Sequence, residues 1–387
     1  MKEIRNIIIR ELKSIFSSRL YVLALLVFPI LGCLFLGGIY SSGFLVKLPA
    51  AVIDNDNTKI SRTIIRYFDA SPDIEIKYRI SNIEELKDLF AKQKAVMGIY
   101  IPKDIQKNIK RQKPQNIPVF VNSANYISGN IVEVDANTII TTIGGGIKYK
   151  TLVKRGFSSK QARELLLPVK NSSAKLFNPS LNYNIFLTPG IWMSVIQQLL
   201  ILAGVLSISI EFDLKTVKTM MRSCKKNVFK AMTGKLAVYM VFSYLHFEIL
   251  YRILFRIFGI PIISSVAAAT ALSICFAFAA VSLGMLLSSV LRTTSNALKG
   301  CLIIAAPAFL LSGYTWPPEQ IPTALRAFAQ LIPLTPFLEG FKKIYVQGLG
   351  MEFVMPYAKR LILYGIVFFI SAYFITSARV KNAGRAK

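Results

Sequence analysis

The sequence contains few of the residues with which soluble enzymes perform chemistry. It has one histidine, His246, and four cysteines among its 387 residues, and none of the cysteines lies between positions 41 and 188. We therefore expect no disulfide framework in that region, and no cysteine or histidine spacing resembles a zinc site. Serine, cysteine and histidine form no recognisable triad, so an intramembrane enzyme lacks the paired catalytic residues it would need.

The chain also lacks a phosphate-binding loop. The nearest glycine-lysine sequences, at 234–235 and 146–148, have neither the glycine spacing nor the Ser or Thr that would contact magnesium. The segment 54–58 resembles a calcium loop only superficially, because the turn glycine and the terminal glutamate are missing. We therefore expect no cofactor on this chain and no ATP hydrolysis by it.

Acidic residues are scarce, at 20 against 47 Lys and Arg, which gives a formal charge of +27. The basic residues stand at the ends of apolar segments and along one polar region, and they do not gather on a single recognition helix. This distribution indicates membrane topology signals and a solvated surface, and it argues against a nucleic-acid partner.

Long apolar segments are the dominant positive feature, and hydrophobic residues make up 53% of the chain. About 20 consecutive apolar residues are needed to cross a bilayer as a helix. One such span, 20–40, precedes about 150 mostly polar residues, and the others follow at about 190–210, 236–257, 264–290, 298–313 and 361–378. The pattern predicts an α-helical integral membrane protein with six transmembrane helices, whose five later spans form a bundle over 189–378.

The polar region 41–188 alternates strand and helix signals. Strands are expected at 50–53, 75–80, 96–101 and 117–121, with helices at 58–68 and 81–93 and longer helical segments broken at Gly144-Gly145-Gly146. We expect an α/β domain inserted between the first span and the bundle.

Basic residues predict the orientation of the chain in the membrane. Residues 1–19 form a basic amphipathic stretch, which is either an interfacial helix or simply the charged flank of the first span. The linkers 211–235 and 292–297 and the tail 379–387 are also basic. With six spans, all four segments lie on the same side, so we expect both termini in the cytoplasm, 41–188 outside, and an external, proline-broken re-entrant hairpin at 314–358.

Two groups of polar residues are candidates for function. The loop 211–235 begins with Glu211 and Asp213, followed by Lys215 and Thr216. We expect the second span to continue into the cytoplasm with both carboxylates at an exposed tip, where they would accept hydrogen bonds from a soluble partner. The cationic residues alone are equally consistent with a cytoplasmic loop that contacts anionic lipid.

The second group lies within the third span, where His246 is near Glu248 and Arg252. Glu248 and Arg252 are four residues apart, in the order that favours pairing on a helix. They form either a polar site along a transport path or at a subunit contact, or a self-paired structural ion pair.

Several segments resemble permease subunits of type-2 ATP-binding-cassette (ABC) exporters, in the branch with a large external domain after the first span. The resemblance covers nearly the whole length. It includes Arg10-Glu11 through Pro29, residues 52–56 and 99–102, Phe177-Asn178-Pro179, and Thr188-Pro189-Gly190. Glu211, Lys215-Thr216 and Gly234-Lys235 fall on the family's cytoplasmic motif, with lysine at 215 where glycine is usual. The strongest match is the external hairpin, which contains Ser312, Gly313, Tyr314, Pro318, Pro322 and Pro333.

The resemblance implies a six-helix half-transporter that pairs with a second permease subunit in a homo- or heterodimer. It implies a separate cytoplasmic ABC ATPase that binds ATP and magnesium and docks on the linker after the second span. It also implies export across a bacterial inner membrane, in some relatives together with a periplasmic adaptor and an outer-membrane channel. The alternative function is a non-transporting membrane scaffold or receptor, whose external domain binds a ligand or partner while the bundle anchors it.

Overall fold

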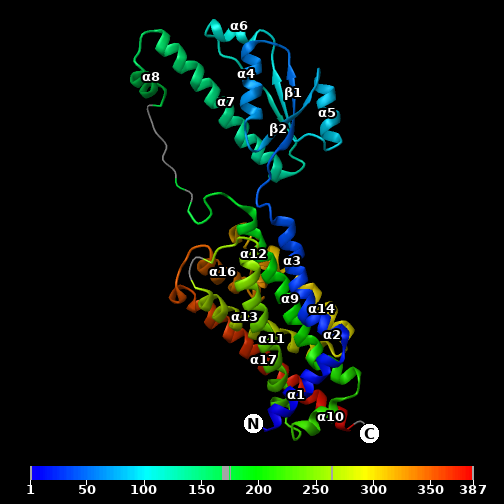
Figure 1. Cartoon of the computed structure of the whole chain (residues 1–387). Coiled ribbons are helices and arrows are strands. Elements are labelled where there is room, and N and C mark those ends of the chain that lie inside the picture. Colours follow the sequence, from blue (N-terminus) through cyan, green and yellow to red (C-terminus); the bar gives the residue numbers. More distant parts are fainter. Residues whose placement is uncertain (1, 168–173, 175, 263–264, 386–387) are drawn as a thin grey trace. The chain divides into compact units, whose positions relative to one another are not determined.

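The computed structural model describes residues 2–167, 174, 176–262 and 265–385. Parts of the predicted 41–188 domain, the predicted start of a span at 264 and the last two residues of the predicted tail lie outside the described residues. The chain forms two compact units. Met1–Gly43 and Lys175–Lys387 build a helical unit, and Phe44–Ala174 build an inserted unit (Figure 1).

Six helical segments of the helical unit are long and apolar enough to cross a membrane, as predicted. They are Leu23–Tyr40, Tyr183–Asp213, Val228–Ile257, Val266–Leu291, Thr294–Leu311 and Met355–Asn382. The first comprises the π-helical turn η1 (Leu23–Val27) and α3 (Phe28–Tyr40), and it follows α1 (Lys2–Ser17) and α2 (Arg19–Val22).

The later spans are α9 (Tyr183–Asp213); α11 (Val228–Ile249) with the π-turn η2 (Leu250–Leu254) and α12 (Phe255–Ile257); α13 (Val266–Leu291); α14 (Thr294–Leu311); and α17 (Met355–Arg385). Polar residues fix where the spans begin. The side chains of Asn182, Asn227, Ser265 and Thr293 each accept a hydrogen bond from a backbone N–H in the first turn of the helix that follows.

Helices α9 and α13 cross at two glycines in the core of the bundle. A Cβ atom added at Gly204 would lie 2.2 Å from the carbonyl oxygen of Val281, and one added at Gly284 would lie 2.1 Å from that of Ile201. Only glycine allows two helix backbones to approach so closely, and such small-residue contacts are common between membrane helices. These two positions therefore set the packing distance in the centre of the unit.

The predicted hairpin segment forms four short helices, the 3₁₀ turns η3 (Pro318–Gln320) and η4 (Met351–Phe353) and the α-helices α15 (Thr323–Ala329) and α16 (Leu334–Tyr345). Helix α16 is packed deeply against the spans. Phe337, Phe341 and Tyr345 are fully buried at four-residue spacing, and the Phe337 ring stacks on Phe276 of α13 with ring centroids 4.1 Å apart. Residues at this spacing share one helix face, which here is buried against the bundle.

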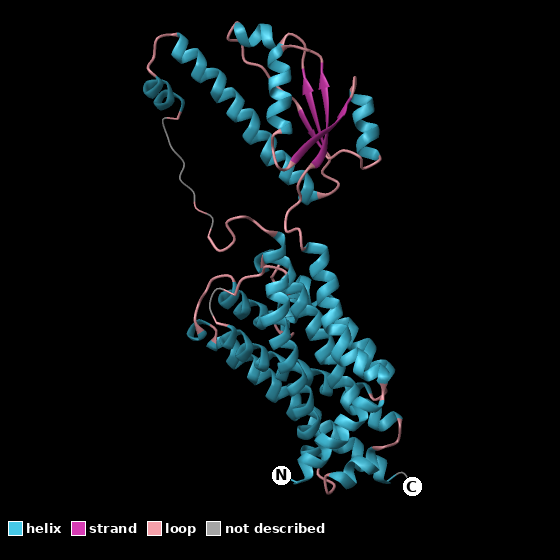
Figure 2. Cartoon of the chain, in the orientation of Figure 1, coloured by secondary structure: helices cyan, strands magenta, loops and turns pink. Residues whose placement is uncertain are grey.

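The inserted unit is α/β, in agreement with the prediction (Figure 2). Its strands are β1 (Leu48–Asp54), β2 (Ile74–Arg79), β3 (Met97–Ile101) and β4 (Val119–Val121), in the sheet order β2-β1-β3-β4. Strand β1 pairs in parallel with β2 and β3, and β4 is antiparallel to β3. Helix α4 (Lys59–Asp69) connects β1 to β2, and α5 (Ile83–Ala91) connects β2 to β3 across β1, as the crossovers between parallel strands require.

The remaining helices of this unit are α6 (Ile105–Lys110), α7 (Tyr126–Lys154) and α8 (Ser159–Leu166). The predicted break at Gly144-Gly145-Gly146 is wrong, because α7 runs through all three glycines. Nothing lies within 4 Å of a Cβ added at any of them. Glycine weakens a helix by about 1 kcal/mol per residue relative to alanine. The long helical segments on either side are enough to keep the three glycines helical.

Candidate functional site

A cluster of charged and hydroxyl side chains joins three segments of the helical unit near the N-terminal helix. We call it the ionic network, and it consists of Arg10 and Glu11 of α1, Glu211 at the end of α9, Thr216, and Lys235 and Tyr239 of α11.

Glu211 is the centre of the ionic network. Its two carboxylate oxygens accept hydrogen bonds from both terminal nitrogens of Arg10, at 2.5 and 2.8 Å. One oxygen also lies 3.0 Å from the ammonium of Lys235, and the other accepts a hydrogen bond from the Thr216 hydroxyl at 2.6 Å. A carboxylate held by a bidentate guanidinium, an ammonium and a hydroxyl has its hydrogen-bonding capacity satisfied within the chain.

Glu11 completes the network from the opposite side. It forms an ion pair with Lys235 and accepts a hydrogen bond from the Tyr239 hydroxyl at 2.7 Å. The side chain of Lys235 is only 2% exposed, and its ammonium forms ion pairs with these two carboxylates. Two carboxylates balance two cations, which is the condition under which buried charges are tolerated.

The local sequence explains how α1 reaches this position. Ile7, Glu11 and Ile15 share the buried face of α1, one turn apart. A Cβ added at Gly234 would lie 2.8 Å from the Ile7 side chain, so the glycine of the Gly234-Lys235 pair allows α1 to lie close against α11. The neighbouring lysine then extends into the ionic network.

The two cations of the network differ in their exposure to solvent. The hydrogen bond to Glu211 raises the pKa of Arg10 above its usual value, although partial burial acts in the opposite direction. The Arg10 side chain remains 25% exposed. Arg10 therefore forms the outer edge of the network and Lys235 its interior.

The structure brings together only part of the predicted docking group. Helix α9 does continue to Asp213, as expected. The expected exposure of Glu211 is wrong, because the residue is 5% exposed and its partners belong to the same chain. Asp213 is exposed, and its carboxylate accepts a hydrogen bond from the backbone N–H of Thr294 at 3.1 Å, which connects the end of α9 to the start of α14.

Lys215 is exposed and has φ +57°, in the left-handed region where glycine is favoured. The resemblance places a glycine here, and this backbone conformation is one that glycine adopts without strain. The tight turn at Lys215 returns the chain so that Thr216 reaches Glu211 and α10 (Val217–Ser223) can start.

Four members of the ionic network were not predicted as site residues: Arg10, Glu11, Lys235 and Tyr239. A signal for Glu11 is present in the sequence, since a lone glutamate stands on the apolar face of an amphipathic helix. A buried carboxylate at such a position requires a cationic partner. The identity of that partner, more than 200 residues away, could not be read from local spacing.

The predicted intramembrane group does not form one site. Glu248 pairs with Arg252 and accepts a hydrogen bond from the Thr270 hydroxyl at 3.1 Å. The Arg252 side chain is 64% exposed. The contacts are those of the self-paired alternative, and His246 is not among them.

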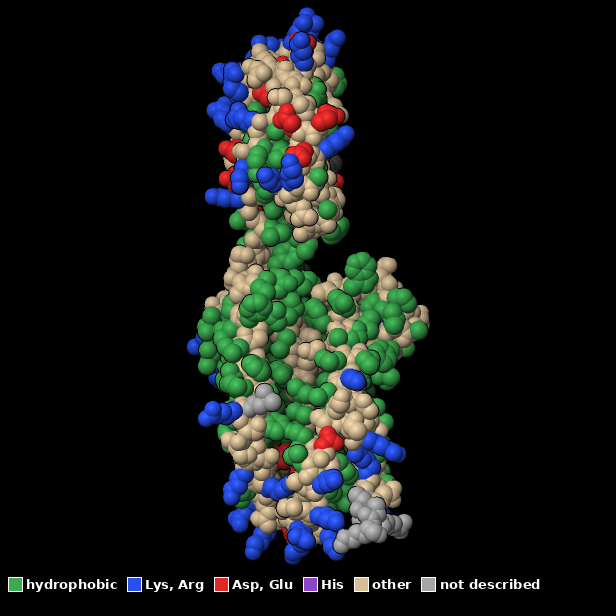
Figure 3. All heavy atoms as spheres, turned by 90° about the vertical axis from the view of Figure 1, so that its right-hand side faces the viewer, with side chains coloured by type: hydrophobic (Ala, Val, Ile, Leu, Met, Phe, Trp, Pro, Cys, Tyr) green, Lys and Arg blue, Asp and Glu red, His purple; other side chains and the backbone are tan. Residues whose placement is uncertain are grey.

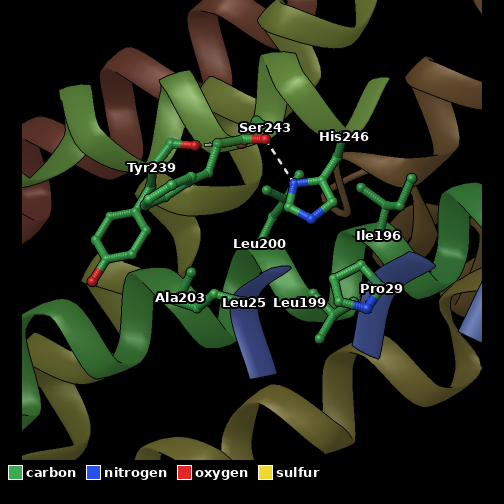
Figure 4. Close-up of a pocket in the computed structure, with 10 residues that line it drawn as sticks. Leu25, Pro29, Ile196, Leu199, Leu200, Ala203, Tyr239, Ser243 and His246 are labelled. Atoms are coloured by element: carbon green, nitrogen blue, oxygen red, sulfur yellow. Dashed lines mark hydrogen bonds between the residues drawn. The ribbon is translucent and has the colours of Figure 1, made fainter. Parts of the chain in front are cut away.

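His246 faces a separate, mostly apolar pocket lined by residues of η1, α3, α9 and α11 (Figure 4). Its Nδ1 lies 2.6 Å from the carbonyl oxygen of Phe242, one turn earlier in α11. In the part of the chain that the structure describes, no group of three His, Cys, Asp or Glu residues could hold a metal ion.

Two tyrosines of the predicted hairpin segment donate hydrogen bonds to backbone carbonyls of α9 in the turn before Pro189. Pro189 has no N–H to donate to the carbonyl of Ile185, and the hydroxyl of Tyr345 takes the place of that donor. The Tyr314 hydroxyl donates to the next carbonyl, that of Phe186, at 2.6 Å. A Cβ at Gly190 would lie 2.6 Å from the Tyr314 ring, so this glycine makes room for the tyrosine.

The other hairpin residues shape its turns. Gly313 has φ +76° and lies against Pro318, which opens η3, while Pro322 and Pro333 precede α15 and α16. Ser312 is buried and its hydroxyl donates to the carbonyl of Phe309 at 2.6 Å.

Comparison with known proteins identifies the family. A model of the ABC-2 family transporter proteins matches residues 19–374. The probable multidrug ABC transporter permease YbhR of Escherichia coli is 22% identical over 90% of this chain and 91% of its own. The inner membrane transport permease YhhJ of E. coli is 24% identical over 96% of this chain and 97% of its own.

The linearmycin resistance permease protein LnrN of Bacillus subtilis is 21% identical over 90% of this chain and 92% of its own. The family match, the six long apolar helices and the full-length similarity to ABC permeases agree with one another. The chain is a multi-pass membrane protein that belongs to the ABC-2 family of transporter proteins.

Proposed function

We propose that this chain is the permease subunit of an ABC exporter, which moves its substrate out across a bacterial inner membrane with ATP hydrolysed by a separate subunit. ATP and magnesium would be bound by that partner, and this chain would hydrolyse no ATP. The family match over residues 19–374 is the observation that carries this proposal. The names of two relatives, a multidrug permease and a resistance permease, support transport outward.

The ATPase would dock on the turn that follows α9. Asp213, Leu214 and Lys215 are exposed there, and Leu214 is 68% exposed, which suits a short apolar anchor between two charged groups. Glu211 and Thr216 lie beneath the turn in the ionic network and would fix its position. In this proposal Asp213, Leu214 and Lys215 contact the ATPase. Glu211 and Thr216 transmit its movement to α1 and α11.

The orientation and assembly follow from the same proposal. Both termini and the turn after α9 would face the cytoplasm, with the inserted unit outside. Exposed Lys and Arg side chains gather over the end of the helical unit where α1 and α10 lie, while hydrophobic side chains cover more of the half of the unit away from that end (Figure 3). That pattern is expected of a cytoplasmic end facing anionic lipid. A second permease subunit would complete the transporter, and the inserted unit would be the contact point for any periplasmic adaptor and outer-membrane channel.

Affinity purification of the chain from its own membranes, followed by identification of any co-purifying ATPase, tests the proposal. We expect Leu214→Glu to abolish capture, because it removes the apolar anchor without touching the ionic network. Leu165→Glu is the matched control, since Leu165 of α8 is 51% exposed and lies in the inserted unit, outside both the turn and the membrane spans. Equal capture by the parent and by Leu214→Glu would contradict docking at this turn, and the absence of any ATPase would contradict the proposed function.

A further inference from the structure

An open pocket of about 210 Å³ lies between the turn after α14, helix α16 and the start of α17. Two consecutive lysines of α16, Lys342 and Lys343, line it together with Gln347. Side chains at consecutive helix positions point about 100° apart. The pocket therefore extends around the side of α16 that bears Lys342 and Lys343, and the two ammonium groups enter it from different directions. The proposed export function assigns no role to this pocket.

Each lysine is held against an aromatic ring. The Lys342 ammonium lies 4.7 Å from the centroid of the Tyr314 ring, and the Lys343 ammonium lies 5.8 Å from that of Tyr357. Neither ammonium group makes an ion pair or hydrogen bond with any residue that the structure describes. Contacts with ring faces orient an ammonium but leave its three N–H donors available.

The charge of the pocket is not balanced from within. Glu339, one turn before Lys343, is the only carboxylate among the lining residues, against two ammonium groups. Partial burial lowers the pKa of Lys342, whereas Glu339 acts in the opposite direction. An incompletely solvated cation without an anionic partner is unfavourable, and an anion bound in the pocket would relieve this.

We propose that this pocket binds an oxyanion, a phosphate or phosphodiester group, supplied by the headgroup of a membrane lipid or by a soluble phosphorylated molecule. The two ammonium groups and the Gln347 amide provide donors on several sides, which suits a group with several charged oxygens. The space exceeds that of one phosphate group, so the pocket can accept the substituents of a phosphodiester.

Amine footprinting tests this site without changing the fold. The full chain in maltoside micelles, free of phosphate, is treated with an acetylating reagent, and acetylation of each lysine is measured by mass spectrometry. Three additions are compared at equal ionic strength: phosphatidylglycerol, diacylglycerol and inorganic phosphate. Lys359 is the internal control, because it is exposed on α17 two residues after Tyr357 and does not line the pocket.

We expect phosphatidylglycerol, inorganic phosphate or both to slow acetylation of Lys342 and Lys343 several-fold relative to Lys359. Protection by the phospholipid alone identifies a lipid headgroup, and protection by inorganic phosphate identifies a soluble oxyanion. Diacylglycerol, which lacks the phosphodiester, should protect neither lysine. If no anion protects the pair more than Lys359, or if diacylglycerol protects it equally, the proposal is wrong.

A variant that should bind the anion more tightly provides an independent test. Glu339→Gln removes the only carboxylate among the lining residues, so the concentration of the effective anion needed for half protection should fall several-fold. A damaged pocket would lose protection, so a gain cannot come from misfolding. Unchanged or weaker protection in Glu339→Gln would contradict the electrostatic basis of the site.

Discussion

Substitution of Glu211 by glutamine is the most informative single perturbation of the ionic network. It removes one of two carboxylates that balance Arg10 and Lys235, and it leaves Lys235, which is 2% exposed, with Glu11 alone. Removing one partner of a buried ion pair typically costs about 3–5 kcal/mol. For a unit of this size that corresponds to a fall in Tm on the order of 10 °C.

The assay is thermal unfolding of the detergent-solubilised chain. Glu3→Gln is the control on the same helix, because Glu3 also connects α1 to Lys225 and Lys230, but through exposed ammonium groups. We expect that control to change Tm much less. The double variant Arg10→Gln with Glu211→Gln restores charge balance and should be more stable than Glu211→Gln alone.

Two results would refute this reasoning. If Glu211→Gln unfolds within a degree of the parent, the carboxylate does not stabilise the packing of α1 against α9 and α11. If the fall in Tm of the double variant equals the sum of the falls for Arg10→Gln and Glu211→Gln alone, the two residues are not coupled. Their observed contact would then contribute no stability.

Three further predictions concern the backbone and the orientation of the chain. Lys215→Gly relieves a left-handed conformation that costs a non-glycine residue about 1 kcal/mol, so thermal unfolding should shift upward by a few degrees; a lower Tm would contradict the strain at this turn. Gly284→Ala places a Cβ against the Ile201 carbonyl and should destabilise the helical unit by about 1–3 kcal/mol, whereas Gly144→Ala, with open space around it, should leave Tm the same or slightly higher. In a background without native cysteines, a membrane-impermeant thiol reagent should label Lys87→Cys in intact cells with a permeable outer membrane but label Lys218→Cys only after lysis; equal labelling would overturn the proposed orientation.

Much of the fold was predictable because the bilayer imposes a length and a composition on each span. The α/β character of the inserted unit was also accessible, since its strands alternate with amphipathic helices. The helix through Gly144-Gly145-Gly146 was mispredicted. Three residues of low helix propensity within an otherwise continuous helical segment raise its free energy less than ending the helix would.

The candidate site was predictable only in part. The sequence singled out Glu211 and Thr216, and the structure brings the two together. The burial of Glu211 could not be foreseen, because it depends on α1 lying across the ends of α9 and α11. That arrangement rests on a glycine at 234 and on ion pairs between residues 200 or more positions apart. Local patterns show that a charge stands on an apolar face, but they do not show which distant charge it meets.

ATP hydrolysis in proteoliposomes tests the central claim most directly, namely that a separate ATPase drives this chain through the ionic network. The chain alone should hydrolyse no ATP, and hydrolysis should appear when the co-purifying ATPase is added. The double variant Arg10→Gln with Glu211→Gln should still bind the ATPase through the exposed turn but should no longer alter its rate of hydrolysis. Hydrolysis by the chain alone, or unchanged stimulation of the ATPase by the double variant, would contradict the account.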